Sequence, residues 1–166
     1  MNDKSKPRPV LTEEFRLSFC ALYEAAADMN GVIRFQMEML FPKERGATAQ
    51  FSELAAIYNE ALASAKFSGA GPTPRSFKEA VIDGNSKKQE GRHGMFMIKA
   101  TANPEINGKP YRPRLLMPDR TLAKPGDIYE GCWCRAILSA YSYEARKDGK
   151  ANGPIISRGA AYNILT

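Results

Sequence analysis

The sequence has little of what most catalytic and metal sites need. Its 166 residues include one histidine, His93, and three cysteines, Cys20, Cys132 and Cys134. An odd number of cysteines, with no apolar leader behind the N-terminal lysines, argues against a secreted disulfide framework and favours a reducing cytoplasm. No apolar run approaches the roughly 18 residues that a membrane span needs, so no membrane partner is expected.

Nucleophilic, metal and phosphate chemistry each lack a typical motif. There is no Gly-x-Ser-x-Gly turn, and no glycine-rich loop is followed by Lys-Ser or Lys-Thr. Zinc ligand pairs usually have two or more residues between them, whereas Cys132 and Cys134 have one. We expect no enzyme, no metal and no cofactor. A thiol or metal enzyme that uses Cys132, Cys134 and His93 stays open as an alternative.

Positive charge is in excess. The chain has 24 Lys and Arg against 18 Asp and Glu, a formal net charge of +6. This excess favours a polyanionic partner, although the cations are spread along the chain and many cationic surfaces are merely solvated.

Alternating hydrophobicity predicts a mainly β protein with a helical insertion. Residues 16–23 and 32–41 read as a hairpin around an Asn-Gly turn. In the first strand one face holds Leu17, Phe19 and Ala21; in the second, the core face holds Ile33, Phe35, Met37, Met39 and Phe41. The elements that follow are a helix capped by Thr48, a short helix with a capping box at Ser76, a strand over 95–101, a basic loop over 103–125, and a last strand with a bulge at Gly159.

The order of these elements predicts the fold. Residues 1–14 read as a flexible N-terminal arm, and residues 15–166 as a single domain. Five or so strands with a helix and long basic loops favour a five-stranded Greek-key barrel of the OB type, with one longer helix and a short second helix. Gly131 and Gly159 are natural points at which the long strands would bend.

The stretch from Gly126 to Tyr143 points most directly to a function. Read as one strand over 127–143, it has a small apolar face with Cys132, Cys134, Ala136, Leu138 and Ala140. The opposite face carries Trp133, Arg135, Ile137, Ser139, Tyr141 and Tyr143. Flat rings beside a cation on an open sheet suit single-stranded nucleic acid, because every base has a π-face to stack. In the other interpretation, both faces of the sheet are covered and Trp133 belongs to the core.

Basic and aromatic residues elsewhere extend this candidate site. Arg34 and Lys99 point outward from predicted strands, and Arg92 lies in a polar loop. Pro113 holds Arg112 and Arg114 on one extended segment, next to Tyr111, which could instead pack against the barrel. The candidate DNA-binding residues are therefore Trp133, Arg135, Tyr141, Tyr143, Arg34, Lys99, Tyr111, Arg112, Arg114 and Arg92.

Three stretches of the sequence resemble a family of phage and prophage single-stranded DNA-binding proteins, formerly classed as a domain of unknown function. One is the opening hairpin, which ends in Leu-Phe-Pro-Lys at 40–43. A second comprises Asp83-Gly84, the strand over 94–100, Arg112-Pro113 and 117–119. The third and most specific is Ile-Tyr-Glu-Gly-Cys-Trp-Cys-Arg-Ala at 128–136, followed by Tyr141 and Tyr143. These stretches cover nearly the whole chain from about residue 16.

The resemblance implies an OB fold and sequence-tolerant binding of single-stranded DNA in phage replication or recombination, in the host cytoplasm. We expect a monomer or weak homo-oligomer, with phage replication proteins as possible further partners. An RNA-binding OB-fold protein is the main alternative, because the same surface would serve and only contacts to the 2′-hydroxyl distinguish the two. Replication-type binders often end in an acidic tail, and residues 159–166 contain no acidic run. Either a tail is missing here or partners are recruited in another way.

Overall fold

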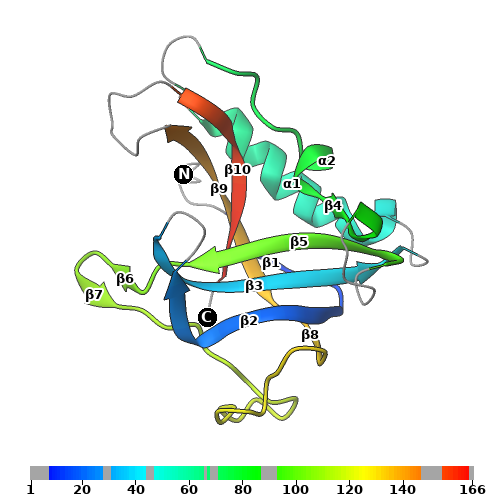
Figure 1. The fold of residues 1–166 in the computed structure, drawn as a ribbon, viewed down its shortest axis with the longest axis vertical. Helices are drawn as coiled ribbons and strands as arrows, with labels where there is room; N and C mark the ends of the chain where they lie inside the picture. The colour runs from blue at the N-terminus through cyan, green and yellow to red at the C-terminus, as the bar shows by residue number, and fades with distance from the viewer. Residues whose placement is uncertain are drawn as a thin grey trace.

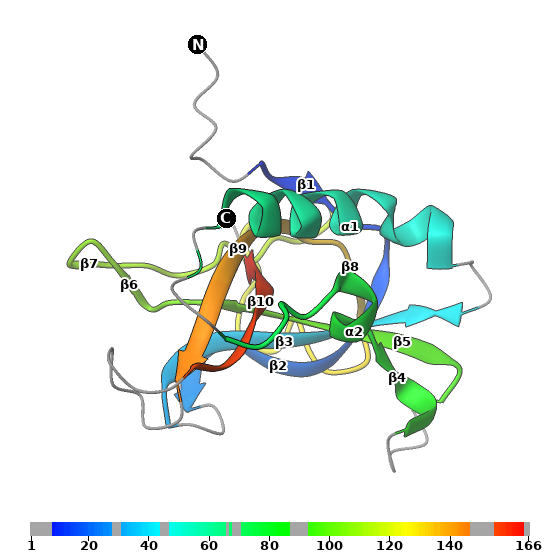
Figure 2. The ribbon, with the colours of Figure 1, turned by 90° about the horizontal axis from the view of Figure 1, so that it is seen from above.

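The computed structural model describes residues 8–27, 31–43, 47–65, 67, 71–86, 93–146 and 155–164. This part of the chain is built on one curled, eight-stranded β-sheet, with two helices packed beside it (Figures 1 and 2). The strands are β1 (Val10–Leu11), β2 (Phe15–Ala27), β3 (Ile33–Pro42), β4 (Ile82–Asp83), β5 (Met95–Ala102), β6 (Glu105–Ile106), β7 (Lys109–Pro110), β8 (Trp133–Cys134), β9 (Ile137–Arg146) and β10 (Ile155–Ile164). The helices are α1 (Ala47–Ser64), α2 (Phe77–Ala80) and the short 3₁₀ turn η2 (Gly84–Ser86). The predicted mainly β protein with one longer and one short helix is confirmed.

The strands of the main sheet follow the order β1-β9-β10-β5-β3-β2-β8, and β4 pairs with β5. In the described chain, the pairing of β10 with β5 is parallel, and the other pairings are antiparallel. Figure 1 shows β5, β3 and β2 side by side, with β9 and β10 crossing them steeply. The small hairpin β6–β7 projects from the sheet in both views.

The two ends of this strand order are joined by the chain itself. β1 leads into β2, and β8 leads into β9. Val10 lies opposite Leu138 in β1–β9, and Phe15 lies opposite Cys134 in β2–β8. Between these pairs the amide of Thr12 donates to the carbonyl of Ala136 at 2.8 Å. Residues 10–17 therefore run antiparallel to 131–138 along their length, and the sheet begins before the boundary expected at residue 15.

The core lies between the sheet and α1. Phe51, Leu54, Ile57 and Tyr58 of α1 are buried, at the three- and four-residue spacing of one helix face. Phe51 stacks edge-on against Phe41 of β3, with ring centroids 5.2 Å apart. The helix begins at Ala47, so Thr48 lies within its first turn and is not the N-cap that the sequence analysis predicted it to be. Ser76 caps α2 as the sequence predicted, because its hydroxyl accepts from the amide of Glu79; the same hydroxyl also donates to the Glu79 carboxylate at 3.2 Å.

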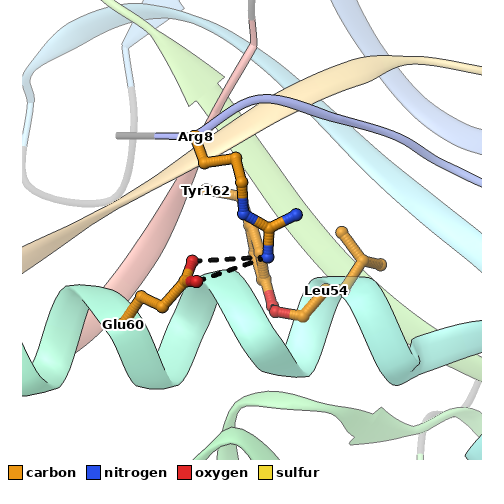
Figure 3. Close-up of polar contacts among 4 residues, drawn as sticks. All are labelled: Arg8, Leu54, Glu60 and Tyr162. Atoms are coloured by element: carbon orange, nitrogen blue, oxygen red, sulfur yellow. Dashed lines mark hydrogen bonds and ion pairs between the residues drawn. The ribbon is translucent and has the colours of Figure 1, made fainter. Parts of the chain in front are cut away.

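Polar contacts fix α1 to neighbouring elements (Figure 3). The hydroxyl of Tyr162, on β10, donates to the carbonyl of Leu54 at 2.7 Å, inside the core. At the surface, Arg8 and Glu60 approach to 3.4 Å with both side chains about half exposed. The buried contact contributes more to stability, because water screens the exposed ion pair.

Four further sequence predictions need correction. The expected long strand over 127–143 is broken into a turn, β8 and β9, because Gly131 has a φ of +101° that turns the backbone before Trp133. Leu17 and Phe19 do not share the predicted face: Leu17 is buried and Phe19 is exposed, because the pairing of β2 with β3 shifts between Leu17 and Cys20. Ile33 is exposed at the start of β3, whereas the other four predicted core residues of that strand are buried. The bulge of the last strand lies between Ile155 and Ser157, and Gly159 pairs in register with Tyr143.

We expect Tyr162→Phe to lower the free energy of unfolding by about 0.5–1.5 kcal/mol, because it removes one buried hydrogen bond without changing the ring. Tyr141→Phe is the matched control, since that ring is 36% exposed on the neighbouring strand. Urea denaturation of both variants measures the difference. Equal losses for the two variants would contradict this role of Tyr162.

Candidate nucleic-acid interface

One row of small and polar residues crosses five strands on the face of the sheet opposite the core. Consecutive register pairs define it: Ser139 with Asn163, Asn163 with Thr101, Thr101 with Gln36, and Gln36 with Ala21. None of the five belongs to the core cluster, whose members alternate with them along each strand. Gln36, Thr101 and Asn163 are partly exposed, whereas Ser139 and Ala21 at the two ends of the row are buried. Four strand spacings give the row a length of about 19 Å.

One ring and two cations flank this row. Tyr141 follows Ser139 by two residues on β9 and is 36% exposed. Lys99 precedes Thr101 by two residues on β5, and its ammonium lies 3.9 Å from the Glu38 carboxylate. Arg34 precedes Gln36 by two residues on β3. In the described chain, its buried Nε has no hydrogen-bond partner. We call the row with Tyr141, Lys99 and Arg34 the outer wall. It lies on β9, β10, β5, β3 and β2, and Figure 2 shows β2, β3 and β5 on the side of the molecule away from α1.

Trp133 and Arg135 are exposed as the sequence predicted, but neither belongs to the row or to its three flanking residues. Trp133 is 51% exposed and sits opposite Arg16 in the β2–β8 pair. Nε of Arg135 donates to the carbonyl of Thr12 at 3.0 Å. Arg16 pairs in turn with Leu40 of β3, so Trp133 lies on the same sheet face as Gln36, four residues along β3 from it. Trp133 therefore lies toward the β2 end of the strand order, whereas Tyr141 lies on β9 at the other end of the row. Ser139, predicted on the same face as the rings, is 6% exposed.

Tyr143 and Tyr111 make contacts within the protein. The guanidinium of Arg75 lies 5.9 Å from the centre of the Tyr143 ring. The hydroxyl of Tyr111 donates to the carbonyl of Ile164 at 3.0 Å, and its ring packs against the core. For Tyr111, this is the packing role that the sequence analysis left open.

Arg112 and Arg114 are both exposed on either side of the buried Pro113. Arg112 lines an open groove of about 560 Å³, whose other side is residues 19–26 of β2. We call this the edge groove. Arg92 lies outside the described residues.

Sequence reasoning missed several exposed side chains of the same kinds. They are Phe19, in the edge groove; Arg16, beside Trp133; Tyr129, which is 59% exposed; and Arg75, over Tyr143. Phe19 could not be found from alternation, because a bulge changes the face of every residue after it. Tyr129 lies outside both the row and the edge groove, so its exposure alone does not place it in the candidate site.

The cysteines form a half-buried cluster. The sulfurs of Cys132 and Cys134 lie 3.3 Å apart and share a hydrogen bond. Burial is the main cause that raises the pKa of the Cys134 thiol to about 12, and burial also raises the pKa of Cys20. Within the described residues, no group of three or more His, Cys, Asp or Glu could hold a metal ion. Nor does any helix in the described part have the length and apolar character to span a membrane.

We expect native Cys134 to react slowly with iodoacetamide, because roughly one thiol in ten thousand is ionised at pH 8 when the pKa is about 12. The rate should rise about tenfold per pH unit, as the thiolate fraction does. Mass spectrometry of alkylated peptides measures it, with the urea-unfolded chain as control. Equal rates in the native and unfolded chains would mean that the fold does not suppress the reactivity of Cys134. That result would support the thiol-enzyme alternative.

Comparison with known proteins gives a consistent result. A family described as "Enterobacter phage Enc34, ssDNA-binding protein" matches residues 8–153. Among solved structures, a C-terminally truncated single-stranded DNA-binding protein of bacteriophage Enc34 superposes with a TM-score of 0.62 at 18% identity, covering 95% of this chain and 82% of that chain. The same phage protein in complex with ssDNA gives a TM-score of 0.59 at 18% identity, with coverages of 95% and 85%. The gp2.5 single-stranded DNA-binding protein of bacteriophage T7 gives 0.61 at 8% identity, with coverages of 97% and 85%. No curated protein matches the chain.

Proposed function

Because the chain belongs to the family of the Enterobacter phage Enc34 ssDNA-binding protein, we propose that it is a non-enzymatic protein that binds single-stranded DNA without reading its sequence. Its setting would be phage DNA replication or recombination, with phage replication proteins as further partners. The observation that carries the proposal is the outer wall, where one ring and two cations border a row of small side chains.

The proposed binding combines two kinds of contact. Tyr141 supplies a ring on which a base can stack, and Lys99 and Arg34 supply charges for phosphates. Neither contact distinguishes one base from another, since every base has a π-face and every nucleotide a phosphate. Trp133 and Arg135, beside residues 12–16, and Tyr143, two residues beyond Tyr141 on β9, lie at different ends of the wall, so only a longer DNA strand would meet them. Arg112 and Arg114 would extend the positive charge beyond β2.

We further assign the fold to the five-stranded Greek-key OB type. Five strands are eight residues or longer, and they follow the order β9-β10-β5-β3-β2 with one parallel pair. The pairing of 10–17 with 131–138 supports closure of this order into a small barrel, in which β1 and β2 act as one bent strand.

Fluorescence anisotropy of labelled oligo(dT) tests the proposal. The wild-type protein should bind it more tightly than a duplex of equal length. Tyr141→Ala should weaken binding about 5- to 150-fold, the value of one stacked base. Tyr129→Ala removes an exposed ring outside the wall and serves as the matched control.

The proposal fails if the wild-type protein binds no oligonucleotide or prefers the duplex. Equal effects of Tyr141→Ala and Tyr129→Ala would remove Tyr141 from the site. The affinity for a matched RNA oligomer tests the RNA-binding alternative, which predicts tighter binding to RNA than to DNA through the 2′-hydroxyl.

Lys99 and Glu38 carry opposite charges, so substitutions at the two positions should change DNA affinity in opposite directions. Lys99→Ala should weaken binding several-fold and reduce the slope of log affinity against log salt by about 0.7, the value of one phosphate contact. Glu38→Gln should strengthen binding, because it removes a carboxylate 3.9 Å from the Lys99 ammonium. If both changes acted in the same direction, the wall would not be a phosphate-binding surface.

A further inference from the structure

The edge groove lies beside the outer wall and has no assigned role. Residues 19–26 of β2 form one side, and Arg112 and Pro125 form the other. Its volume of about 560 Å³ falls within the usual range for small-ligand sites. Ala21 ends the row of the wall and also lines the groove, so the two features meet at this buried residue.

The β2 side of the groove is a strand edge carrying an exposed ring. In the described chain, β8 ends the strand order, and its segment follows β2 only as far as Leu17. The register of β2 against β3 also shifts between Leu17 and Cys20, and again between Ala21 and Ala26. These irregularities turn Phe19 outward, where it is 39% exposed.

The opposite side of the groove is fixed in place by tyrosine side chains. The Tyr23 hydroxyl donates to the carbonyl of Lys124 at 2.6 Å and accepts from the amide of Ile128 at 3.1 Å. Tyr111, next to Arg112, is bonded to Ile164 of β10. Arg112 therefore extends from an anchored segment, and the groove is preformed. A preformed site loses less conformational entropy on binding.

The groove combines a flat ring, a guanidinium and a strand edge. A ring stacks on a base, and a guanidinium binds a phosphate. The exposed carboxylate of Glu24 also lines the groove and repels phosphate, which assigns the phosphate to the Arg112 side. The segment 103–125 carries five Lys and Arg against two Asp and Glu, so its charge favours nucleic acid.

We propose that the edge groove binds one unpaired base of the DNA strand that occupies the outer wall, with the base stacked on Phe19 and a neighbouring phosphate at Arg112. This inference rests on the proposed function. A base can enter only if it leaves its complementary partner, so the groove adds selectivity against duplex DNA. The DNA strand must also be long enough to span the outer wall and reach past Ala21 into the groove.

The test uses Phe19→Ala, Phe19→Trp and the Tyr129→Ala control, with labelled oligo(dT) of increasing length. Phe19→Ala should weaken binding of long oligomers about 5- to 150-fold, the range measured for single stacked bases, and leave short oligomers unaffected. Phe19→Trp keeps a flat ring and should bind within a few-fold of wild type. Thermal denaturation checks folding, which the loss of an exposed ring should leave intact.

A fluorescence measurement reports on the groove itself. In a Trp133→Phe background, Phe19→Trp places the single indole of the chain in the groove. Long oligo(dT) should quench its emission, while anisotropy records binding independently. If the oligomer binds but the indole is not quenched and Phe19→Ala matches wild type, the inference is overturned and the proposed function stands. Such a result would favour a peptide strand on the β2 edge. If no oligomer binds the wild-type protein, the proposed function fails as well.

Discussion

The antiparallel pairing of residues 10–17 with 131–138 is the constraint on which the rest of the structure depends. It joins two segments more than a hundred residues apart, so its closure entropy must be offset by the core that it completes. That core includes Phe15, which is 1% exposed and stacks against Phe41. The same pairing places Trp133 outside, because residues on one strand alternate between the two faces. Burial of Phe15 and exposure of the indole thus follow from one register.

The pairing also explains why β2 has different neighbours along its length. Its first residues lie between β3 and β8, whereas its later residues have β3 on one side and the 112–125 segment on the other. Regular pairing on both edges would leave no place for the unpaired extra residue of a bulge. With one edge released, the strand accommodates two register shifts, and bulges of this kind commonly redirect side chains at sheet edges. The edge groove is a consequence of where β8 stops.

Sequence alternation predicted β3 well and β2 poorly for a physical reason. β3 is a central strand whose register against β5 is unbroken from Phe35 to Pro42, so the period of two holds over that stretch. In β2 the period fails at Phe19, because a bulge depends on the partner strands and leaves no local signature. The stretch over 127–143 misled in another way. Its alternation of small and large residues begins at Cys132, after the turn at Gly131, and runs on through Arg135 and Ala136, where β8 has ended and β9 has not begun, so the pattern does not reveal that break.

The outer wall could not have been assembled from the sequence, because its row depends on four separate strand registers. Tyr141, Lys99 and Arg34 were recognisable one by one as outward residues, yet nothing in their spacing relates them. In the sequence, Thr101, Gln36 and Asn163 are isolated polar residues with no pattern that indicates a function. Their placement side by side leaves a floor with few large side chains, and the Gln36 amide is already bonded to the carbonyl of Ala26. A floor whose amide group is engaged within the protein offers little to distinguish one base edge from another. Rings and charges at its margins would then dominate the interaction with a nucleic acid, which is the balance that sequence-tolerant binding requires.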